Sequence, residues 1–460
     1  MSDQSSYSNK KGTHNVPKHR SIAKKRKFTG NRFTFEQSTA NTSTSAEKLL
    51  HNNDNNVVID PSHGYCILQF LSVFSAISNL VVCKTCQKKV TFNQASPRGL
   101  GFKIAIICEC GNSYINSGPM IDNAFEVNRR IVAVMRLLGI GINGINLFCG
   151  LMDLACKFYD QTFAGCFTNL QIAAETICKL SMQQAINEEK ELTLKEENSE
   201  TNLTVSGDGT WKKRGHTSRF GVVTLAGKYS KKILDSCVKS TYCQSCVFWK
   251  KKKDSEPEAY EEWLSLHEEE CDVNHKGSAS KMEVDSVKDM FGRSISKYGV
   301  KYTRYIGDGD SATHKGLIDL NPYDIPVAKL DLSRHELLDR CKGNNTQNNN
   351  ESYNGLLWHF SPKHLHNGFK TIELSNNFAT AIFNDGYSSI LKMFNLMGVI
   401  VGPAARDFAA LKDNTRIRIA DHRQRASSKE GRSSRRKASS AEQALFEEEE
   451  GELYGPGIAD

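Results

Sequence analysis

The sequence has no long hydrophobic run. No uninterrupted apolar stretch among its 460 residues reaches the about 18 that a membrane-spanning helix needs. The N-terminus is polar and basic, without the apolar segment of a secretory signal. We therefore expect no membrane partner and a reducing compartment. There the 14 cysteines are better metal ligands or buried thiols than disulfides.

Several familiar binding motifs are also missing. We find no P-loop and no glycine-rich nucleotide motif, so we expect no nucleotide cofactor and no requirement for ATP. The sequence also has no recognisable helix-turn-helix or homeodomain signature. If the protein binds nucleic acid, it does so without these common modules.

The net charge of +8 comes from the N-terminal end. Residues 1–32 hold nine of the 60 basic and one of the 52 acidic residues, so 51 of each remain elsewhere. A nucleic-acid groove in the rest of the chain must therefore come from local clustering. The polar composition of residues 1–60 predicts a disordered basic tail. Its basic cluster is typical of a nuclear import signal or a DNA-contacting arm, unless the tail is merely solubilising: Lys24, Lys25, Arg26 and Lys27.

Two close cysteine pairs follow an apolar run that predicts a helix over residues 65–82. The first pair has the CxxC spacing and the second, just before Gly111, has the CxC spacing. Each turn would present two thiolates to one tetrahedral zinc ion, whereas the alternative is four buried free thiols. The spacing favours a zinc-ribbon-like subdomain over residues 61–120. Its expected ligands are Cys83, Cys86, Cys108 and Cys110.

The next segment, residues 121–200, has helical periodicity. We expect a helix around residues 127–138 and further helices over residues 145–160 and 165–188. The charged run over residues 188–200 predicts a solvated helix end or a linker.

Residues 201–412 alternate strand and helix signals. The order is three strands, a helix, two strands and a helix that begins at Glu351, which is typical of a ribonuclease-H-like α/β core. The predicted strands cover 203–208, 220–226, 233–238, 302–308 and 325–330, and the first helix covers 282–298. An apolar helical segment closes the core, and residues 413–460 predict a disordered charged tail.

Acidic residues stand where this fold could bind metal. Asp208 ends the first strand, Asp308 ends the fourth, and Glu351 opens the late helix, while Asp310 competes with Asp308. Two-metal phosphodiester chemistry needs carboxylates that converge on two divalent ions about 3.5–4 Å apart. The spacing is compatible with a Mg²⁺ or Mn²⁺ site, although acids at strand ends are more often solvated loop residues.

A second cysteine and histidine group is inserted at residues 237–275. CxxC followed by HxxxC predicts a zinc knuckle, because His and Cys four residues apart share one helix face. The alternative is an exposed Lys- and Glu-rich loop with incidental thiols. The expected ligands are Cys243, Cys246, His267 and Cys271, with His275 a spare candidate and Cys237 a strand thiol.

Basic residues follow the first acid closely. They could contact DNA phosphates near the carboxylates, or they could form a solvated hairpin turn: Lys212, Lys213 and Arg214.

These stretches together resemble the Mutator-like transposase domain common in insect genomes. The resemblance lies in DGTWKKRGHTS at 208–218, YIGDGDS at 305–311 and TQNNNESYNG at 346–355, and in shorter stretches at 126–130, 358–363 and 383–386. It also covers the Cys/His insertion. It implies an Asp-Asp-Glu transposase with Asp208, Asp308 and Glu351 as its triad. Such an enzyme acts in the nucleus on double-stranded DNA, commonly as a homo-oligomer, cutting element ends and joining the freed 3′-hydroxyl to target DNA.

The sequence departs from this family between its second and third acids. Only 42 residues separate Asp308 from Glu351, and Leu332 stands where a cysteine partner of His335 is usual. This indicates an internal deletion near residues 340–343. Three hypotheses follow: an active transposase, a non-catalytic DNA-binding or chromatin protein derived from one, and a decaying element copy.

Overall fold

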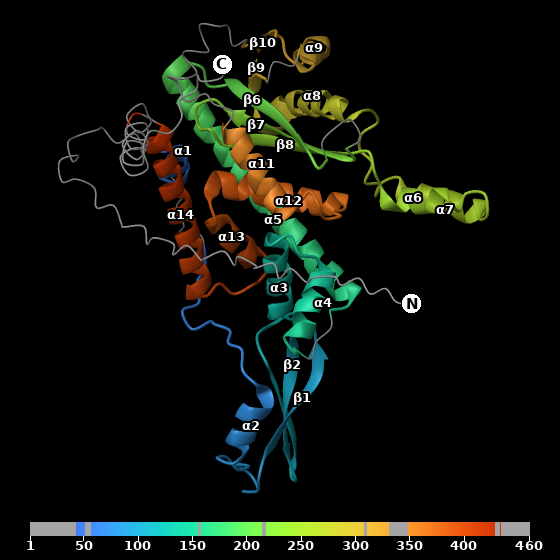
Figure 1. Ribbon diagram of the computed structural model, residues 1–460, viewed down its shortest axis with the longest axis vertical. Coiled ribbons are helices and arrows are strands. Elements are labelled where there is room, and N and C mark those ends of the chain that lie inside the picture. Colours follow the sequence, from blue (N-terminus) through green and yellow to red (C-terminus); the bar gives the residue numbers. More distant parts are fainter. Residues whose placement is uncertain are drawn as a thin grey trace, which may run out of the picture. The chain divides into compact units, whose positions relative to one another are not determined.

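The computed structural model describes residues 43–50, 57–154, 158–213, 218–307, 311–330, 348–427 and 433 (Figure 1). Several predicted residues lie outside these ranges: the basic cluster Lys24 to Lys27, Arg214, Asp308, Asp310, Leu332 and His335.

The cysteine-rich region is a small antiparallel sheet with a helix beside it. The sheet has the order β1-β2-β3, from Thr91–Arg98, Gly101–Cys108 and Gly111–Asn116. The expected helix over residues 65–82 is shorter, because α2 covers only Phe70–Ser78 and Val82 forms a bridge with Lys89. The chain therefore leaves the helix early to form the turn that carries the first cysteine pair. A short hairpin, β4 (Met120–Ile121) and β5 (Ala124–Phe125), leads to the next helices.

Three helices follow, α3 (Glu126–Leu137), α4 (Ile142–Leu151) and α5 (Asp160–Glu197). The charged run at residues 188–200 was expected to be a solvated helix end or a linker, and most of it forms the end of α5. Glu189 there is fully buried and accepts hydrogen bonds from the backbone N–H groups of Tyr229 (3.0 Å) and Ser230 (2.7 Å). A buried carboxylate needs such donors, so the prediction of a solvated residue was wrong for Glu189, whereas most of the run is exposed or half-buried.

A mixed sheet of five strands forms the core, in the order β10-β9-β6-β7-β8. The strand β7 is antiparallel to its neighbours β6 and β8, while β9 runs parallel to β6 and β10 parallel to β9. Their bounds are Asn202–Trp211 (β6), Phe220–Gly227 (β7), Ile233–Ser240 (β8), Lys301–Ile306 (β9) and Ala328–Lys329 (β10).

Helices cover both faces of this sheet (Figure 1). Every residue of β7 is buried, and its successive side chains enter different cores because they point to opposite faces. Val223 packs with α8 (Ala279–Tyr298), and Val222 packs with α11 (Asn348–Phe360) and α12 (Phe369–Asp385). This layering places α11 against β7, which pairs with the central strand β6.

The remaining helices are α1 (Thr44–Leu50), α6 (Gln244–Lys250), α7 (Pro257–His267), α9 (Ser311–Leu320), α13 (Ser388–Leu396) and α14 (Pro403–Ser427). The helix α14 passes residue 412, where the sequence predicts a tail to begin. Arg416 within it donates hydrogen bonds to the carbonyls of Ile382 (2.7 Å) and Phe383 (2.8 Å), so this stretch is part of the folded structure. Among the described helices none is long and apolar enough by itself to span a membrane, although the sharply bent pair α3 and α4 passes that test together.

Candidate metal centres and carboxylate site

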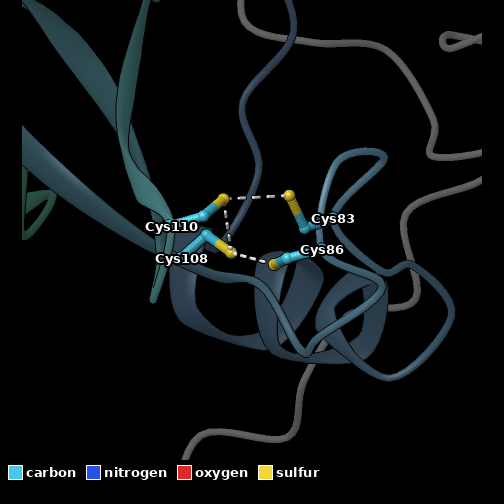
Figure 2. Close-up of side chains that lie close together, drawn as sticks. All are labelled: Cys83, Cys86, Cys108 and Cys110. Atoms are coloured by element: carbon cyan, nitrogen blue, oxygen red, sulfur yellow. Dashed lines mark hydrogen bonds between the residues drawn. The ribbon is translucent and has the colours of Figure 1, made fainter.

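The first cysteine cluster has the four thiols facing one another (Figure 2). The sulfur–sulfur distances are 3.5 Å for Cys83–Cys110, 3.2 Å for Cys86–Cys108 and 3.5 Å for Cys108–Cys110. All four sulfurs lie within 4.8 Å of one another. The first pair stands on a tight turn in which Cys83 N–H donates to the Lys88 carbonyl and Gln87 has a left-handed backbone with φ 57°. The structure therefore brings together the four residues that the spacing predicted.

This donor set fits zinc. Four thiolates about 2.3 Å from one tetrahedral ion lie about 3.8 Å apart, close to the separations found here. The backbone N–H groups of Cys86 and Thr85 lower the pKa of the Cys83 thiol to about 6, which favours the thiolate that binds metal. The neighbouring thiol of Cys108, followed by Cys83 and Cys86, raises the pKa of Cys110 to about 12. Thiols this close compete for protons, and a cation would favour their ionised forms together.

The second cluster lies between α6 and α7. His267 Nε2 is 3.4 Å from Cys243 Sγ and 3.2 Å from Cys246 Sγ, while the sulfurs of Cys246 and Cys271 are 3.5 Å apart. Cys243 and His267 are buried, and the four ligand atoms lie within 4.8 Å of one another. One nitrogen and three sulfurs at these separations also suit a tetrahedral zinc ion.

Aromatic rings fix the histidine of this cluster. Trp263, one turn before His267 on α7, stacks on the imidazole at 4.4 Å, and Trp249 from α6 stacks on Trp263 at 5.4 Å. Stacked rings restrict the imidazole to one plane and so aim Nε2 at the thiols. The spare candidate, His275, is not part of the cluster, because its Nδ1 faces Asp285 at 3.3 Å. Cys237 lies on β8 at the edge of the core, as expected for a strand thiol.

The carboxylate site is built on β6 and α11. Asp208 accepts a hydrogen bond of 2.9 Å from the side-chain amide of Asn354. Glu351 lies in the first turn of α11, exposed, and three residues before Asn354, so both side chains share one helix face. One turn further, Trp358 donates from its indole nitrogen to the Thr210 hydroxyl at 2.9 Å. These two contacts from α11 to β6 bring the helix that carries Glu351 to the strand that carries Asp208.

The parallel strand β9 meets β6 on its other side. Ile306, the last residue of β9, pairs with Ser206, two residues before Asp208. The segment with Asp308 and Asp310 follows directly in the sequence but lies outside the described residues. A further acid, Glu283 on α8, lies next to β6, since a Cβ on Gly209 would be 3.0 Å from its Oε2.

The basic residues after Asp208 behave differently from one another. Lys213 is exposed, but Lys212 is buried, so the alternative of a solvated hairpin turn is wrong for Lys212, while its contact with DNA phosphates stays a prediction. Its Nζ lies 2.6 Å from the side-chain amide of Asn367, and the amide orientation that satisfies its neighbours turns the Asn367 oxygen toward both Lys212 and the Ser361 hydroxyl. Burial lowers the pKa of Lys212 to about 8, with smaller contributions from Lys213 and Arg136.

Two contacts of the candidate site were not predicted from the sequence, those of Asn354 and Trp358. Both stand in or just after the stretch around Glu351, and their spacing of three and seven residues after it is the signal that places them on its helix face.

The model of the family described as Mutator-like transposase matches residues 64–347. The chain belongs to the Mutator-like transposase family. The matched residues contain both cysteine clusters, Asp208 and Asp308, and they end just before α11. No curated protein and no solved structure matches the chain.

Proposed function

We propose that this family member is a DNA transposase whose catalytic core has a ribonuclease-H-like fold. The support is the strand arrangement: three antiparallel strands, then a fourth and a fifth strand parallel to the first, in the spatial order β10-β9-β6-β7-β8. In that arrangement the first strand is central, and a late helix packs beside it. Here these elements are β6 and α11, and they carry Asp208 and Glu351.

The proposed catalytic residues are Asp208, Asp308 and Glu351. Carboxylate oxygens are the donors that Mg²⁺ and Mn²⁺ prefer, and the half-buried Asp208 and exposed Glu351 are accessible from solvent. Two such ions, when bound, would activate the attacking water or hydroxyl and stabilise the leaving oxygen. Asp308 enters this proposal from its sequence position, two residues after the end of β9.

The hydrogen bond from Asn354 to Asp208 carries the proposal. Because Asn354 donates its side-chain N–H to Asp208 Oδ2, it holds the Asp208 carboxylate in one orientation, as an outer partner of a metal-binding carboxylate would. Glu351 follows the same helix face, so the bond also sets the position of the second carboxylate. We further propose that each cysteine cluster holds one zinc ion that stabilises its subdomain, that the protein acts in the nucleus, and that it assembles with itself to join two DNA ends.

A cleavage assay tests the catalytic claim. The full chain, loaded with zinc, is incubated with supercoiled plasmid and Mg²⁺ or Mn²⁺, beside the variants Asp208→Asn and Glu351→Gln. We expect metal-dependent nicking that both variants lose. The matched control is Asp319→Asn, an exposed acid on α9, and it should cut like the unchanged chain. Nicking that persists in either carboxylate variant would refute the assignment.

A second candidate is a non-catalytic DNA-binding protein derived from a transposase. Only 42 residues separate Asp308 from Glu351. This segment is shorter than the largely helical segment that the family usually has between its second and third acids. This reading predicts a folded, zinc-loaded chain that binds DNA in a salt-sensitive manner but does not cut it. In that case Asp208→Asn would leave both binding and the lack of cleavage unchanged.

A further inference from the structure

Two buried cations without an acidic partner lie beyond the end of β6. Arg136 on α3 is 4% exposed and Lys212 is 7% exposed. Within the described residues neither forms an ion pair, and the Nε and Nη2 atoms of Arg136 lack a hydrogen-bond partner. Arg136 makes one bond, from Nη1 to the Ile140 carbonyl at 3.2 Å. Burying unpaired charges is costly, so such a pair points to an anion that completes the site.

The two cations repel rather than compensate each other. Burial lowers the pKa of Arg136 to about 10, and no acidic group acts on it. The pKa of Lys212 is lowered to about 8 by burial first and then by two further cations, Lys213 and Arg136. A bound anion would reverse both shifts, because an opposite charge favours the charged form of each group.

The loop that connects α11 and α12 lies against these cations. Ser361 and Asn367, at the two ends of the loop, converge with Lys212 through the Asn367 side-chain oxygen. Pro362 approaches α3 so closely that a Cβ on Gly139, three residues after Arg136, would be 2.9 Å from it. The loop thus spans the distance from β6 to the end of α3.

The outer surface of this loop is basic. Lys363 is exposed and its Nζ lies 4.9 Å from the centre of the Trp358 ring, while His364 and His366 are exposed beside it. Lys213 adds a further exposed cation at the end of β6. The buried pair therefore lies beneath a surface whose side chains suit an approaching polyanion.

The carboxylate site is close along the same strand. Lys212 follows Asp208 by four residues, about 13 Å along an extended chain. Successive phosphates of one DNA strand are spaced by about 3.4 Å along the helix axis, so this is a distance of a few nucleotides. Trp358 bonds to Thr210 between the two positions.

We infer that Arg136 and Lys212 form a phosphate-binding site for the backbone of a DNA strand held at the carboxylates. The inference rests on the proposed function, and the anion site that it assigns is separate from the carboxylates. The loop at residues 361–368 covers this site, and Lys213 and Lys363 form its exposed rim.

The test compares DNA binding with stability. Binding of a labelled duplex to the full chain is measured in EDTA-free buffer without Mg²⁺, at several salt concentrations, for Lys212→Met and Arg136→Met. We expect each variant to bind about tenfold more weakly and the slope of log affinity against log salt to fall by about one. Because an unpaired buried charge is removed, neither variant should melt at a lower temperature than the unchanged chain.

A buried but paired lysine supplies the matched control. Lys232 is 4% exposed and forms a 2.6 Å ion pair with Glu188. Lys232→Met should lower the melting temperature, since it leaves Glu188 unpaired, and should leave DNA binding unchanged. Inorganic phosphate, compared with chloride at equal ionic strength, should raise the melting temperature of the unchanged chain but not that of Lys212→Met.

Two results would overturn the inference: DNA binding by Lys212→Met and Arg136→Met equal to that of the unchanged chain, or a fall in melting temperature in both with no loss of binding. The conservative Lys212→Arg keeps the charge and should retain binding, which separates a lost anion contact from lost packing. Failure of the proposed function is seen elsewhere, as absent cleavage by the unchanged chain that still binds DNA.

Discussion

The hydrogen bond between Asn354 and Asp208 allows a quantitative prediction for Asn354→Ala. A hydrogen bond to a charged acceptor contributes about 1.5–3 kcal/mol to stability. Because Asp208 is only half-buried, this bond contributes about 1.5 kcal/mol, the lower end of the range. Alanine is the better helix former, which offsets about 0.6 kcal/mol within α11. The free energy of unfolding should therefore fall by about 1 kcal/mol, a shift of about 2 °C in the melting temperature of a chain this large.

Activity should fall by more than stability does. Without the amide N–H, Asp208 loses the group that orients it, and losing such a supporting contact lowers metal affinity or activity by about 10- to 100-fold. Plasmid nicking at several Mn²⁺ concentrations measures this effect, and higher Mn²⁺ should restore part of the activity. The control Ser352→Ala changes an exposed residue of the same helix and should leave nicking unchanged.

Plasmid nicking by Asn354→Ala at the normal rate at all Mn²⁺ concentrations would refute the orienting role of Asn354.

A second contact gives an independent check on the helix position. Trp358 and Thr210 share a half-buried hydrogen bond of 2.9 Å, so a double-mutant cycle of Trp358→Phe and Thr210→Val should give a coupling energy of about 1 kcal/mol.

Three further predictions concern the rest of the molecule. The purified chain should contain two zinc ions by metal analysis, and Cys83→Ser and Cys243→Ser should each lose one; zinc contents that do not change would contradict the cluster assignments. Burial, with smaller contributions from nearby acids, raises the pKa of Glu373 from 4.5 to about 7. The folded chain then holds a proton that the unfolded chain releases, so stability should fall as pH rises from about 4.5 to 7, and Glu373→Gln should flatten this slope in chemical unfolding. Glu126→Ala should lower the free energy of unfolding by on the order of 3–5 kcal/mol, because it leaves Arg130 without its buried partner at 2.6 Å; a loss under about 1 kcal/mol would count against that role.

Much of the core was readable from local patterns. The strands β6 to β9 and the helix α8 begin and end within a few residues of their predicted positions, because continuous apolar runs and acid-ended strands are local signals. The two cysteine clusters were predicted from the sequence spacing of their ligands. Each ligand pair lies on one short turn or helix, so this spacing determines how close the two side chains lie. In these cases residues near in sequence determine the geometry.

Features that depend on distant contacts were not readable. The composition of residues 188–200 predicts a solvated segment. Glu189 is nevertheless buried, because a turn at Tyr229 and Ser230 supplies backbone N–H donors to its carboxylate. The basic stretch around Lys212 predicts a surface residue, but the loop after α11 covers its side chain. Burial of a charged side chain requires a partner or a ligand from elsewhere in the chain, and local composition does not reveal that group.

The helix boundaries show the same limit. The apolar run at residues 65–82 predicts one helix, but α2 ends at Ser78 because the following residues form the turn and bridge that hold Cys83. The role of Asn354 lay within a motif that was recognised, yet its partner Asp208 is 146 residues away. The prediction therefore identified the candidate acids but not the contact that joins the helix α11 to the strand β6.

The central claim is that Asp208 and Glu351 bind the same divalent metal. Its most direct test is the binding of Mn²⁺ to the zinc-loaded chain, measured from the electron paramagnetic resonance signal of free Mn²⁺. If Asp208 and Glu351 serve one divalent-metal site, Asp208→Asn and Glu351→Gln should each weaken Mn²⁺ binding, and the double variant should be little weaker than either. Mn²⁺ binding that is unaffected by Glu351→Gln would contradict the claim that these two carboxylates act together.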